Sequence, residues 1–198
     1  NFICLDVGAN IGYLSILMAK KAKNGLVVSI EPSPRIFTYL LENIEINKIK
    51  NIITLNVGIA EENGIREFYV FDFADDQSAL VVDKRWKLKK YKIVTLRLDE
   101  LLRILKLTKI DFLKIDIEGA ELLSLKSLGR CITNVKYIWF EFNEENYRKF
   151  NYEGKEIINF LKTHNFSLYK LNGKNNFCKI KDYPMEYKGN LLAIKNEN

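Results

Sequence analysis

The segment from Phe2 to Tyr13 constrains the fold of this chain more than any other. It reads Phe-Ile-Cys-Leu-Asp-Val-Gly-Ala-Asn-Ile-Gly-Tyr, an apolar run that ends in an acid and then passes two glycines. Apolar residues at helical spacing follow at once, so the pattern predicts a buried strand, a tight turn and a helix. An apolar strand of this kind is typical of a parallel sheet that helices cover on both faces.

The same alternation of apolar runs and amphipathic stretches continues through the first two thirds of the chain, which predicts βαβ units. Strands are expected over residues 2–7, 26–31, 52–57, 110–115 and 136–142, and helices over 12–23, 34–47 and 119–128. Asp99 is the expected N-cap of a further helix over 100–107.

The remaining segments complete this sheet. Alternating runs over 66–73 and 92–98 predict an inserted hairpin or strands added to the sheet, and a helix over 154–163 precedes an antiparallel pair over 166–171 and 190–195. The predicted fold class is therefore α/β: a doubly wound, mostly parallel sheet with helices on both faces and a closing antiparallel strand. A single domain over residues 1–198 is expected, because a chain of this length with 47% hydrophobic residues can bury one sizeable core.

No apolar run approaches the ~20 residues that span a bilayer, so no membrane span is expected. Cys4, Cys131 and Cys178 are far apart and lack the CxxC spacing of metal sites. They are interpreted as buried thiols of a protein in a reducing compartment, which predicts a cytoplasmic location.

The formal charge of +6 comes mostly from scattered lysines, with the densest patch over residues 83–92. Trp86 and Tyr91 interleave with the basic residues of this patch. One possible function of the chain is therefore that of a non-catalytic RNA-binding module. A solvated loop is the competing interpretation, because one short patch is a modest electrostatic footprint. The Asn-Pro-Pro-aromatic motif of enzymes that methylate nucleic-acid amino groups is missing, so a nucleic-acid partner is not favoured.

The turn after the first strand indicates the kind of ligand. Glycine has no Cβ, so the backbone at Gly8 and Gly12 can pass close to a bound molecule. Their Gly-xxx-Gly spacing lacks the third glycine of the dinucleotide fingerprint, in which a pyrophosphate rests on the helix N-terminus. A ligand without phosphate fits better, and this weakens the alternative of a nicotinamide-dependent oxidoreductase.

Two acids end the first two strands. Glu31 lies about 20 residues beyond the glycine turn, where a carboxylate accepts hydrogen bonds from both hydroxyls of a ribose. Asp6, at the end of the first strand, either orients the turn or meets an amino group of the ligand, and the competing interpretation is a simple cap of the turn. The combination of Asp6, Gly8, Gly12 and Glu31 favours a nucleoside site.

A second strand-to-helix junction carries further charged residues. Lys114, Asp116 and Glu118 alternate along Ile110 to Glu121, and they share one side if the extended backbone continues that far. Glu118 has a competing interpretation as an acid at the start of the next helix, where a carboxylate complements the helix dipole. Glu121 is interpreted as a first-turn helix residue.

These motifs together resemble the FkbM family of methyltransferases. The resemblance rests on Asp6-Val-Gly-Ala-Asn-Ile-Gly12, on Glu31-Pro32 and on Asp111-Phe-Leu-Lys-Ile-Asp-Ile-Glu-Gly-Ala-Glu121, and covers roughly residues 1–145. It implies a Rossmann-like methyltransferase fold, S-adenosylmethionine as methyl donor, and commonly O-methylation of a hydroxyl of a sugar, glycan or small natural product. By this resemblance the methionine end is held by Asp6, Gly8, Asn10 and Gly12, the ribose by Glu31, and the adenine faces Gly58, Ile59 and Ala60.

Methyl transfer requires a nucleophile about 3 Å from the methyl group and a group that removes its proton. Asp116 is the predicted base or orienting group for the acceptor hydroxyl, and Lys114 and Glu118 are predicted to tune it. Glu141 and Asn143, at the mouth of the fifth strand, are expected to join Asp116 in the same crevice. Such oxygens also suit Mg²⁺, but a metal-free cluster of hydrogen-bonded acids is favoured. The sequence leaves the acceptor's identity and the oligomeric state open.

Overall fold

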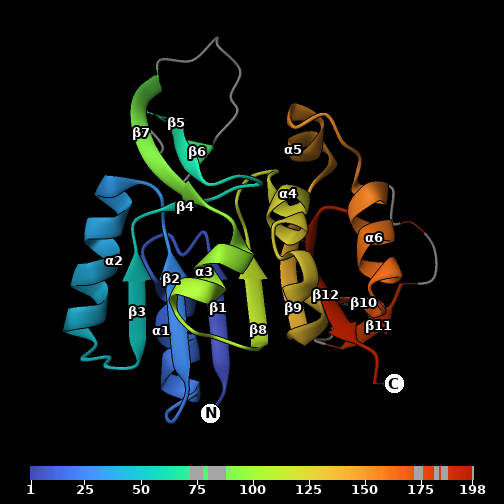
Figure 1. Cartoon of the computed structure of the whole chain (residues 1–198), viewed down its shortest axis with the longest axis horizontal. Coiled ribbons are helices and arrows are strands. Elements are labelled where there is room, and N and C mark those ends of the chain that lie inside the picture. The colour runs from blue at the N-terminus through green and yellow to red at the C-terminus, as the bar shows by residue number, and fades with distance from the viewer. Residues whose placement is uncertain (72–77, 80–87, 172–175, 181–182, 184–186, 198) are drawn as a thin grey trace.

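The computed structural model describes residues 1–71, 78–79, 88–171, 176–180, 183 and 187–197 (Figure 1). Within them the main sheet has the strand order β11-β10-β12-β9-β8-β1-β2-β3. Its strands are β1 (Ile3–Val7), β2 (Leu26–Ile30), β3 (Ile52–Leu55), β8 (Ile110–Ile115), β9 (Val135–Phe142), β10 (Phe166–Leu171), β11 (Phe177–Lys179) and β12 (Gly189–Lys195).

The pairing confirms the predicted doubly wound sheet. β1 pairs in parallel with both β2 and β8, and β3 and β9 extend the parallel part on either side. β12 then runs antiparallel to β9 and to β10, which is the predicted closing arrangement. β2 and β3 thus lie on one side of β1, and the later strands β8 and β9 lie on its other side. The strand order therefore reverses beside β1.

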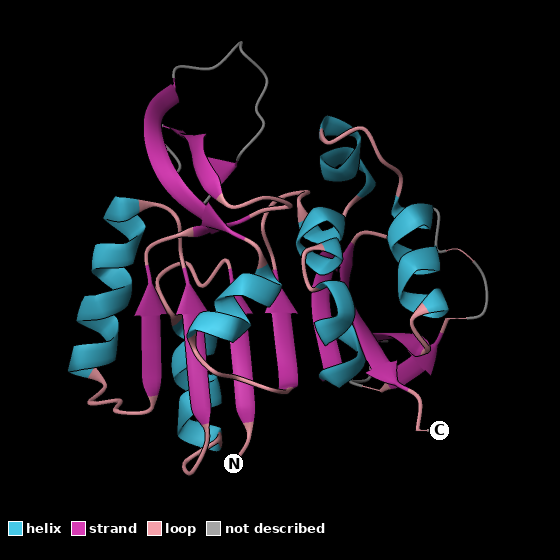
Figure 2. Cartoon of the chain, viewed as in Figure 1, coloured by secondary structure: helices cyan, strands magenta, loops and turns pink. Residues whose placement is uncertain are grey.

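Helices cover both faces of the main sheet, as predicted. They are α1 (Tyr13–Lys21), α2 (Pro34–Ile46), α3 (Leu98–Ile104), α4 (Glu121–Lys126), the 3₁₀ helix η1 (Gly129–Asn134), α5 (Glu144–Lys149) and α6 (Gly154–Thr163). Figure 2 shows α1 behind the strands and α3 and α4 in front of them. Side-chain alternation on β1 produces this division: Cys4 packs with Ala19 of α1, whereas Leu5 belongs to the larger core on the opposite face.

A second, smaller sheet is inserted between β3 and α3. Its order is β4-β7-β5-β6, from β4 (Gly58–Ile59), β5 (Gly64–Phe71), β6 (Ser78–Ala79) and β7 (Leu88–Leu96). The antiparallel pairing of β5 with β7 confirms the predicted hairpin, and Figure 1 places it above the carboxyl ends of the main strands. Trp86 lies outside the described residues, whereas Tyr91 is half-buried against Phe68 and Ile93 and is not a free stacking surface.

Two helix starts differ from the prediction. Arg97, not Asp99, is the N-cap of α3, because the Asp99 carboxylate is bound to the guanidinium of Arg97 and accepts a hydrogen bond from the Glu100 N–H within the first turn. Helix α4 starts two residues later than predicted. Glu118 and Gly119 adopt left-handed backbone conformations, with φ of 55° and 111°, which a right-handed helix cannot include.

The cysteine prediction is correct for Cys4 alone, which is buried. Cys131 is half-buried and Cys178 is exposed on the short outer strand β11, which the sequence pattern did not predict. In the described part of the chain, no helix combines the length and the apolar character needed to cross a membrane.

Candidate active site

The carboxyl ends of β1, β2 and β8 meet at one edge of the main sheet, beneath the small sheet (Figure 1). Ligands of doubly wound sheets bind at this edge, where the strand order reverses. A cavity of about 460 Å³ lies here, which is a typical size for a small-molecule site. We call it the donor cavity. The predicted site residues that line it are Gly8, Asn10, Glu31, Gly58, Ile59, Lys114, Asp116 and Glu118.

The turn after β1 adopts the backbone that its glycines allow. Gly8, Asn10 and Gly12 all have positive φ angles, of 79°, 51° and 88°. The N–H groups of Gly8 and Ala9 both donate to the carbonyl oxygen of Ile30, which fixes the turn to the end of β2. Gly12 does not line the donor cavity. Instead it caps α1, where a Cβ would lie 2.4 Å from the Leu40 side chain of α2.

Asp6 lies beneath this turn rather than in the cavity wall. It is fully buried, and its Oδ2 accepts a 2.6 Å hydrogen bond from the hydroxyl of Ser15 in α1. The ammonium of Lys114 lies 3.2 Å from Asp6 Oδ1 and donates a 2.7 Å hydrogen bond to the carbonyl oxygen of Gly8. Removal of one partner of such a buried ion pair lowers stability by several kcal/mol. The pair therefore holds the turn against β8. This placement fits the predicted orienting role of Asp6.

Glu31 occupies the predicted place at the end of β2 and is 5% exposed. Its Oε2 accepts from the N–H of Asn10 at 2.9 Å, and its Oε1 accepts from the N–H of Ser33 at 2.9 Å. Burial raises the pKa of this carboxyl to about 6, against the opposing effect of the two backbone hydrogen bonds. Each carboxylate oxygen keeps a second lone pair, so Glu31 can still accept hydrogen bonds from a ligand in the cavity.

The wall opposite Lys114 is apolar. It combines Gly58 and Ile59 with Phe68 and Ile93 of the small sheet. A Cβ on Gly58 would lie 2.8 Å from Ile93, so this position admits the close contact between β4 and β7. Ala60 is placed elsewhere and lines a neighbouring cleft. Phe68 and Ile93 were not predicted as site residues. The alternating pattern of a hairpin does not indicate which part of the main sheet its apolar face will contact.

Three acids gather at the mouth of the cavity. Carboxylate oxygens of Asp116, Glu118 and Glu141 all lie within 4.8 Å of one another. Burial, followed by the charges of Glu118 and Asp116, raises the pKa of Glu141. The side chain of Asn143 accepts a 3.2 Å hydrogen bond from the Glu145 N–H and caps α5, and its predicted contact with Asp116 stays a prediction. Glu118, which was predicted to tune Asp116, belongs to the cluster, and its Oε2 accepts from the Asn146 amide at 2.8 Å.

The turn that carries Asp116 is held from below by Glu121. This residue begins α4, as its first-turn interpretation predicted, and its side chain is fully buried. Its Oε1 accepts a 3.0 Å hydrogen bond from the Ile117 N–H, and burial raises the pKa of its carboxyl to about 8. Strand β8 ends at Ile115, so turn geometry, and not continued extension, brings Asp116 and Glu118 together.

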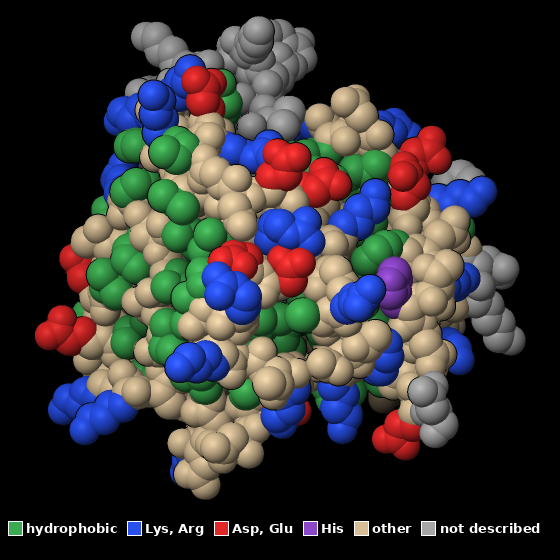
Figure 3. Space-filling model, in the orientation of Figure 1, with side chains coloured by type: hydrophobic (Ala, Val, Ile, Leu, Met, Phe, Trp, Pro, Cys, Tyr) green, Lys and Arg blue, Asp and Glu red, His purple; other side chains and the backbone are tan. Residues whose placement is uncertain are grey.

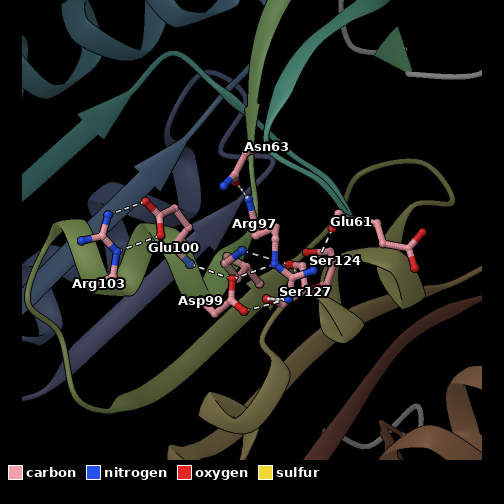
Figure 4. Close-up of polar contacts among 9 residues, drawn as sticks. Glu61, Asn63, Arg97, Asp99, Glu100, Arg103, Ser124 and Ser127 are labelled. Atoms are coloured by element: carbon pink, nitrogen blue, oxygen red, sulfur yellow. Dashed lines mark hydrogen bonds and ion pairs between the residues drawn. The ribbon is translucent and has the colours of Figure 1, made fainter.

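Arg97 fixes the small sheet to the helices in front of the main sheet, as Figure 4 shows. Its guanidinium binds both carboxylate oxygens of Asp99 and donates to the carbonyl oxygens of Glu61, at 2.8 Å, and Ser127, at 3.1 Å. The backbone N–H of Arg97 donates to the side-chain oxygen of Asn63 at 2.8 Å. One residue thereby sets the position of the segment after β4 relative to α4.

The strand order and the place of the donor cavity put the chain in the class of Rossmann-like S-adenosylmethionine-dependent methyltransferase folds. Residues 6–168 match the methyltransferase FkbM domain, and the chain belongs to the FkbM methyltransferase family. Among solved structures, the Bacillus cereus O-methyltransferase in complex with S-adenosylhomocysteine superposes with a TM-score of 0.55 at 14% identity, covering 98% of this chain and 74% of that one. A precorrin-6y C5,15-methyltransferase from Geobacter metallireducens gives 0.53 at 12%, covering 99% and 81%.

Curated relatives show closer sequence similarity. Methyltransferase sdnD of Sordaria araneosa is 27% identical over 157 residues, or 65% of this chain and 61% of the relative. Hexuronic acid methyltransferase AglP of Haloferax volcanii is 27% identical over 141 residues, or 70% and 54%. A 55-residue stretch is 44% identical to a tRNA(Phe) (4-demethylwyosine(37)-C(7)) aminocarboxypropyltransferase of Methanocaldococcus jannaschii, covering 28% and 22%. The chain therefore spans less than two thirds of the length of these relatives.

Proposed function

We propose that this protein is an S-adenosylmethionine-dependent methyltransferase that O-methylates a hydroxyl of a sugar, glycan or small natural product. The observation that carries the proposal is the Glu31 carboxylate, which is fixed by two backbone N–H groups in a cavity at the switch point of the sheet. A carboxylate in this place accepts hydrogen bonds from ribose hydroxyls. The name of the relative AglP, a hexuronic acid methyltransferase, supports a sugar acceptor.

The residues of the donor cavity fit a nucleoside donor that has no phosphate. Its apolar wall at Ile59, Phe68 and Ile93 suits a flat base. Lys114 is the one basic residue of the lining, and its ammonium is already engaged by Gly8 and Asp6. A dinucleotide with a pyrophosphate would find no free cation among these lining residues.

The chain's own residues perform the remaining steps at the acceptor. S-adenosylmethionine, when bound, supplies an electrophilic methyl group and leaves as S-adenosylhomocysteine. Asp116, half-exposed at the cavity wall, is the residue that accepts the proton of the acceptor hydroxyl. Lys114, with its ammonium 3.5 Å from Asp116 Oδ2, holds that carboxylate in position.

Calorimetric titration separates this proposal from its two alternatives. We expect S-adenosylmethionine and S-adenosylhomocysteine to bind at one site, NAD to give no heat, and RNA to bind weakly with a strong salt dependence. Transfer of a labelled methyl group to a fraction of small-molecule and glycan extract would then identify the product. Two results would refute the methyltransferase assignment. One is binding of NAD, and the other is binding of RNA by a protein that binds neither S-adenosylmethionine nor S-adenosylhomocysteine.

Donor affinity should depend on pH through Glu31. The pKa of its carboxyl is raised to about 6, so the group is ionised above this pH and protonated below it. Only the ionised form offers all its oxygen lone pairs to ribose hydroxyls, so the Kd for S-adenosylhomocysteine should rise as the pH falls through 6, by up to about tenfold per pH unit. Calorimetry between pH 8 and pH 5 measures this. Glu31→Gln should bind weakly and without the pH dependence, and a pH-independent wild type would exclude the ribose role.

We expect methyl transfer to persist after removal of divalent cations. Burial, followed by the charges of Glu118 and Asp116, raises the pKa of Glu141, so a proton on this carboxyl can reduce the repulsion among the three acids without a cation. The measurement is the initial rate after dialysis against a chelator, with and without added Mg²⁺. Loss of activity that Mg²⁺ alone restores would show that the same three carboxylates hold a metal.

A further inference from the structure

A second cavity, of about 370 Å³, adjoins the donor cavity and has no role in the proposal above. Ile59 and Ala120 line both cavities, so the two share a wall. One side of this second cavity is β5, and the other is formed by α4 and by Phe150 at the end of α5. We call it the acceptor cleft, because a molecule that fills it has its nearest end beside the turn that carries Asp116.

Arg66 projects from β5 at this cleft with most of its hydrogen-bonding capacity unused. Its ion pair among the described residues is with Glu62 at 3.5 Å, and the Glu62 side chain is 80% exposed. Such a pair at positions i and i+4 contributes little. Arg66 also lies opposite Ile93 in the β5–β7 ladder, and Ile93 lines the donor cavity. The Arg66 side chain therefore leaves β5 on the same face as Ile93, and its exposed pair with Glu62 is weak enough to give way to a ligand.

The two acids of the cleft each lie near a basic residue other than Arg66. Glu67 forms an ion pair with Lys90 and accepts a 2.9 Å hydrogen bond from the hydroxyl of Tyr69. Glu61 has an exposed side chain, and its backbone carbonyl oxygen accepts a 2.8 Å hydrogen bond from the Arg97 guanidinium, which is itself paired with Asp99. Arg66 thus remains as the cation whose charge a ligand can meet. The rings of Tyr69 and Phe150 add apolar surface for the non-polar face of a sugar or other ring.

We infer that the acceptor cleft binds an anionic group of the acceptor and that Arg66 is the residue that holds it. The acceptor class is a hydroxyl compound that also bears a carboxylate or a phosphate, such as an acidic sugar. A guanidinium binds either group through two parallel hydrogen bonds, which fixes orientation as well as charge. This inference rests on the proposed function, since it assigns the second substrate of the same site.

The test is calorimetric titration of the protein, with and without saturating S-adenosylhomocysteine. The probes are methyl β-D-glucuronide, glucose 1-phosphate and the uncharged methyl β-D-glucoside. We expect at least one anionic probe to bind about tenfold or more tightly than the uncharged one, because a hydrogen bond to a charged group contributes that much. The ratio between the carboxylate and phosphate probes identifies which anion the cleft prefers.

Variants locate the binding to Arg66. Arg66→Met should weaken the preferred anionic probe about tenfold to 100-fold and leave both the uncharged probe and S-adenosylhomocysteine unchanged. Arg66→Lys should recover part of the affinity, because the charge remains but the two-pronged geometry is lost. The matched control is Arg103→Met on α3, an exposed arginine that is paired with Glu100 and does not line the cleft. Figure 3 shows acidic and basic side chains side by side over α3, where this pair lies.

Three results would overturn the inference: equal binding of charged and uncharged probes, no binding of either anionic probe at millimolar concentration, or equal losses for all probes in Arg66→Met. Circular dichroism and thermal melting of each variant exclude misfolding as the cause. Failure of the proposed function is a separate result. It would appear as absence of S-adenosylhomocysteine binding by the wild type, while the titrations without this ligand would still test the anion site.

Discussion

Asp116→Asn should lower kcat for methyl transfer by about 100- to 10,000-fold, the usual contribution of a general base. Asparagine keeps the size of the side chain and its place on the cavity wall, but its amide cannot take the proton of a hydroxyl. The carboxylate is half-exposed and 3.5 Å from the Lys114 ammonium, so it is both reachable by an acceptor and held in place. Single-turnover measurement of labelled methyl transfer gives this rate directly.

The effect should be confined to the chemical step. The affinity for S-adenosylhomocysteine should stay close to that of the wild type, because the substitution leaves Glu31 and the glycine turn, the residues proposed to hold the donor, unchanged. Asp111→Asn, in the strand that precedes Asp116, is the matched control: the Asp111 carboxylate accepts from the Ile3 N–H at 2.8 Å and binds Lys109, and it does not line the donor cavity. A rate near that of the wild type in Asp116→Asn, with donor affinity unchanged, would remove Asp116 from the role of base.

Gly8→Ala should abolish donor binding and destabilise the protein by about 2–4 kcal/mol, because it forces two incompatible changes at once. The φ angle of 79° is one that residues with a Cβ rarely adopt, and the new methyl would lie 1.9 Å from the carbonyl oxygen of Asp116. Backbone cannot move aside as a flexible side chain does, so the turn and β8 must separate. That separation would also break the hydrogen bond from Lys114 to the Gly8 carbonyl.

Gly64→Ala provides the control for this prediction. No atom lies within 4 Å of a Cβ added at Gly64, and its φ is outside the left-handed region. The substitution at the start of β5 should change the free energy of unfolding by less than about 0.5 kcal/mol. Urea denaturation measures both variants, and calorimetry with S-adenosylhomocysteine measures binding. Equal stability of Gly8→Ala and Gly64→Ala would show that the turn does not need to press against β8.

The elements that were predicted correctly are those whose buried residues form a recognisable pattern within the element itself. The central strands β1, β2, β8 and β9 are mostly apolar runs, and the antiparallel closing pair alternates. The elements that it missed are short or exposed: β4 has two residues, α5 has six, and every residue of β11 is exposed. Such elements are stabilised by contacts with neighbouring elements, and the periodicity of their own residues does not reveal these contacts.

The predicted sites divide in the same way. Glu31 and the glycine turn were identifiable because each follows its strand at a fixed distance along the chain, and the reversal of strand order brings those ends together. The prediction that Asp99 caps a helix was wrong, because Arg97 binds its carboxylate. The Arg97 guanidinium is also held by the carbonyl oxygens of Glu61 and Ser127, which come together only when separate segments pack.

The sequence by itself determined the strand-turn-helix at Gly8, the acid at the end of β2 and the family to which they point. These depend on short-range sterics and on spacing within one or two elements. Only the tertiary structure decided that Lys114 lies under the glycine turn, that carboxylate oxygens of Asp116, Glu118 and Glu141 lie within 4.8 Å of one another, and that Arg66 borders a cleft beside the donor cavity. Such contacts join residues far apart in the chain, and their distances are set by sheet register and by packing between layers, which operate only after the whole core has formed.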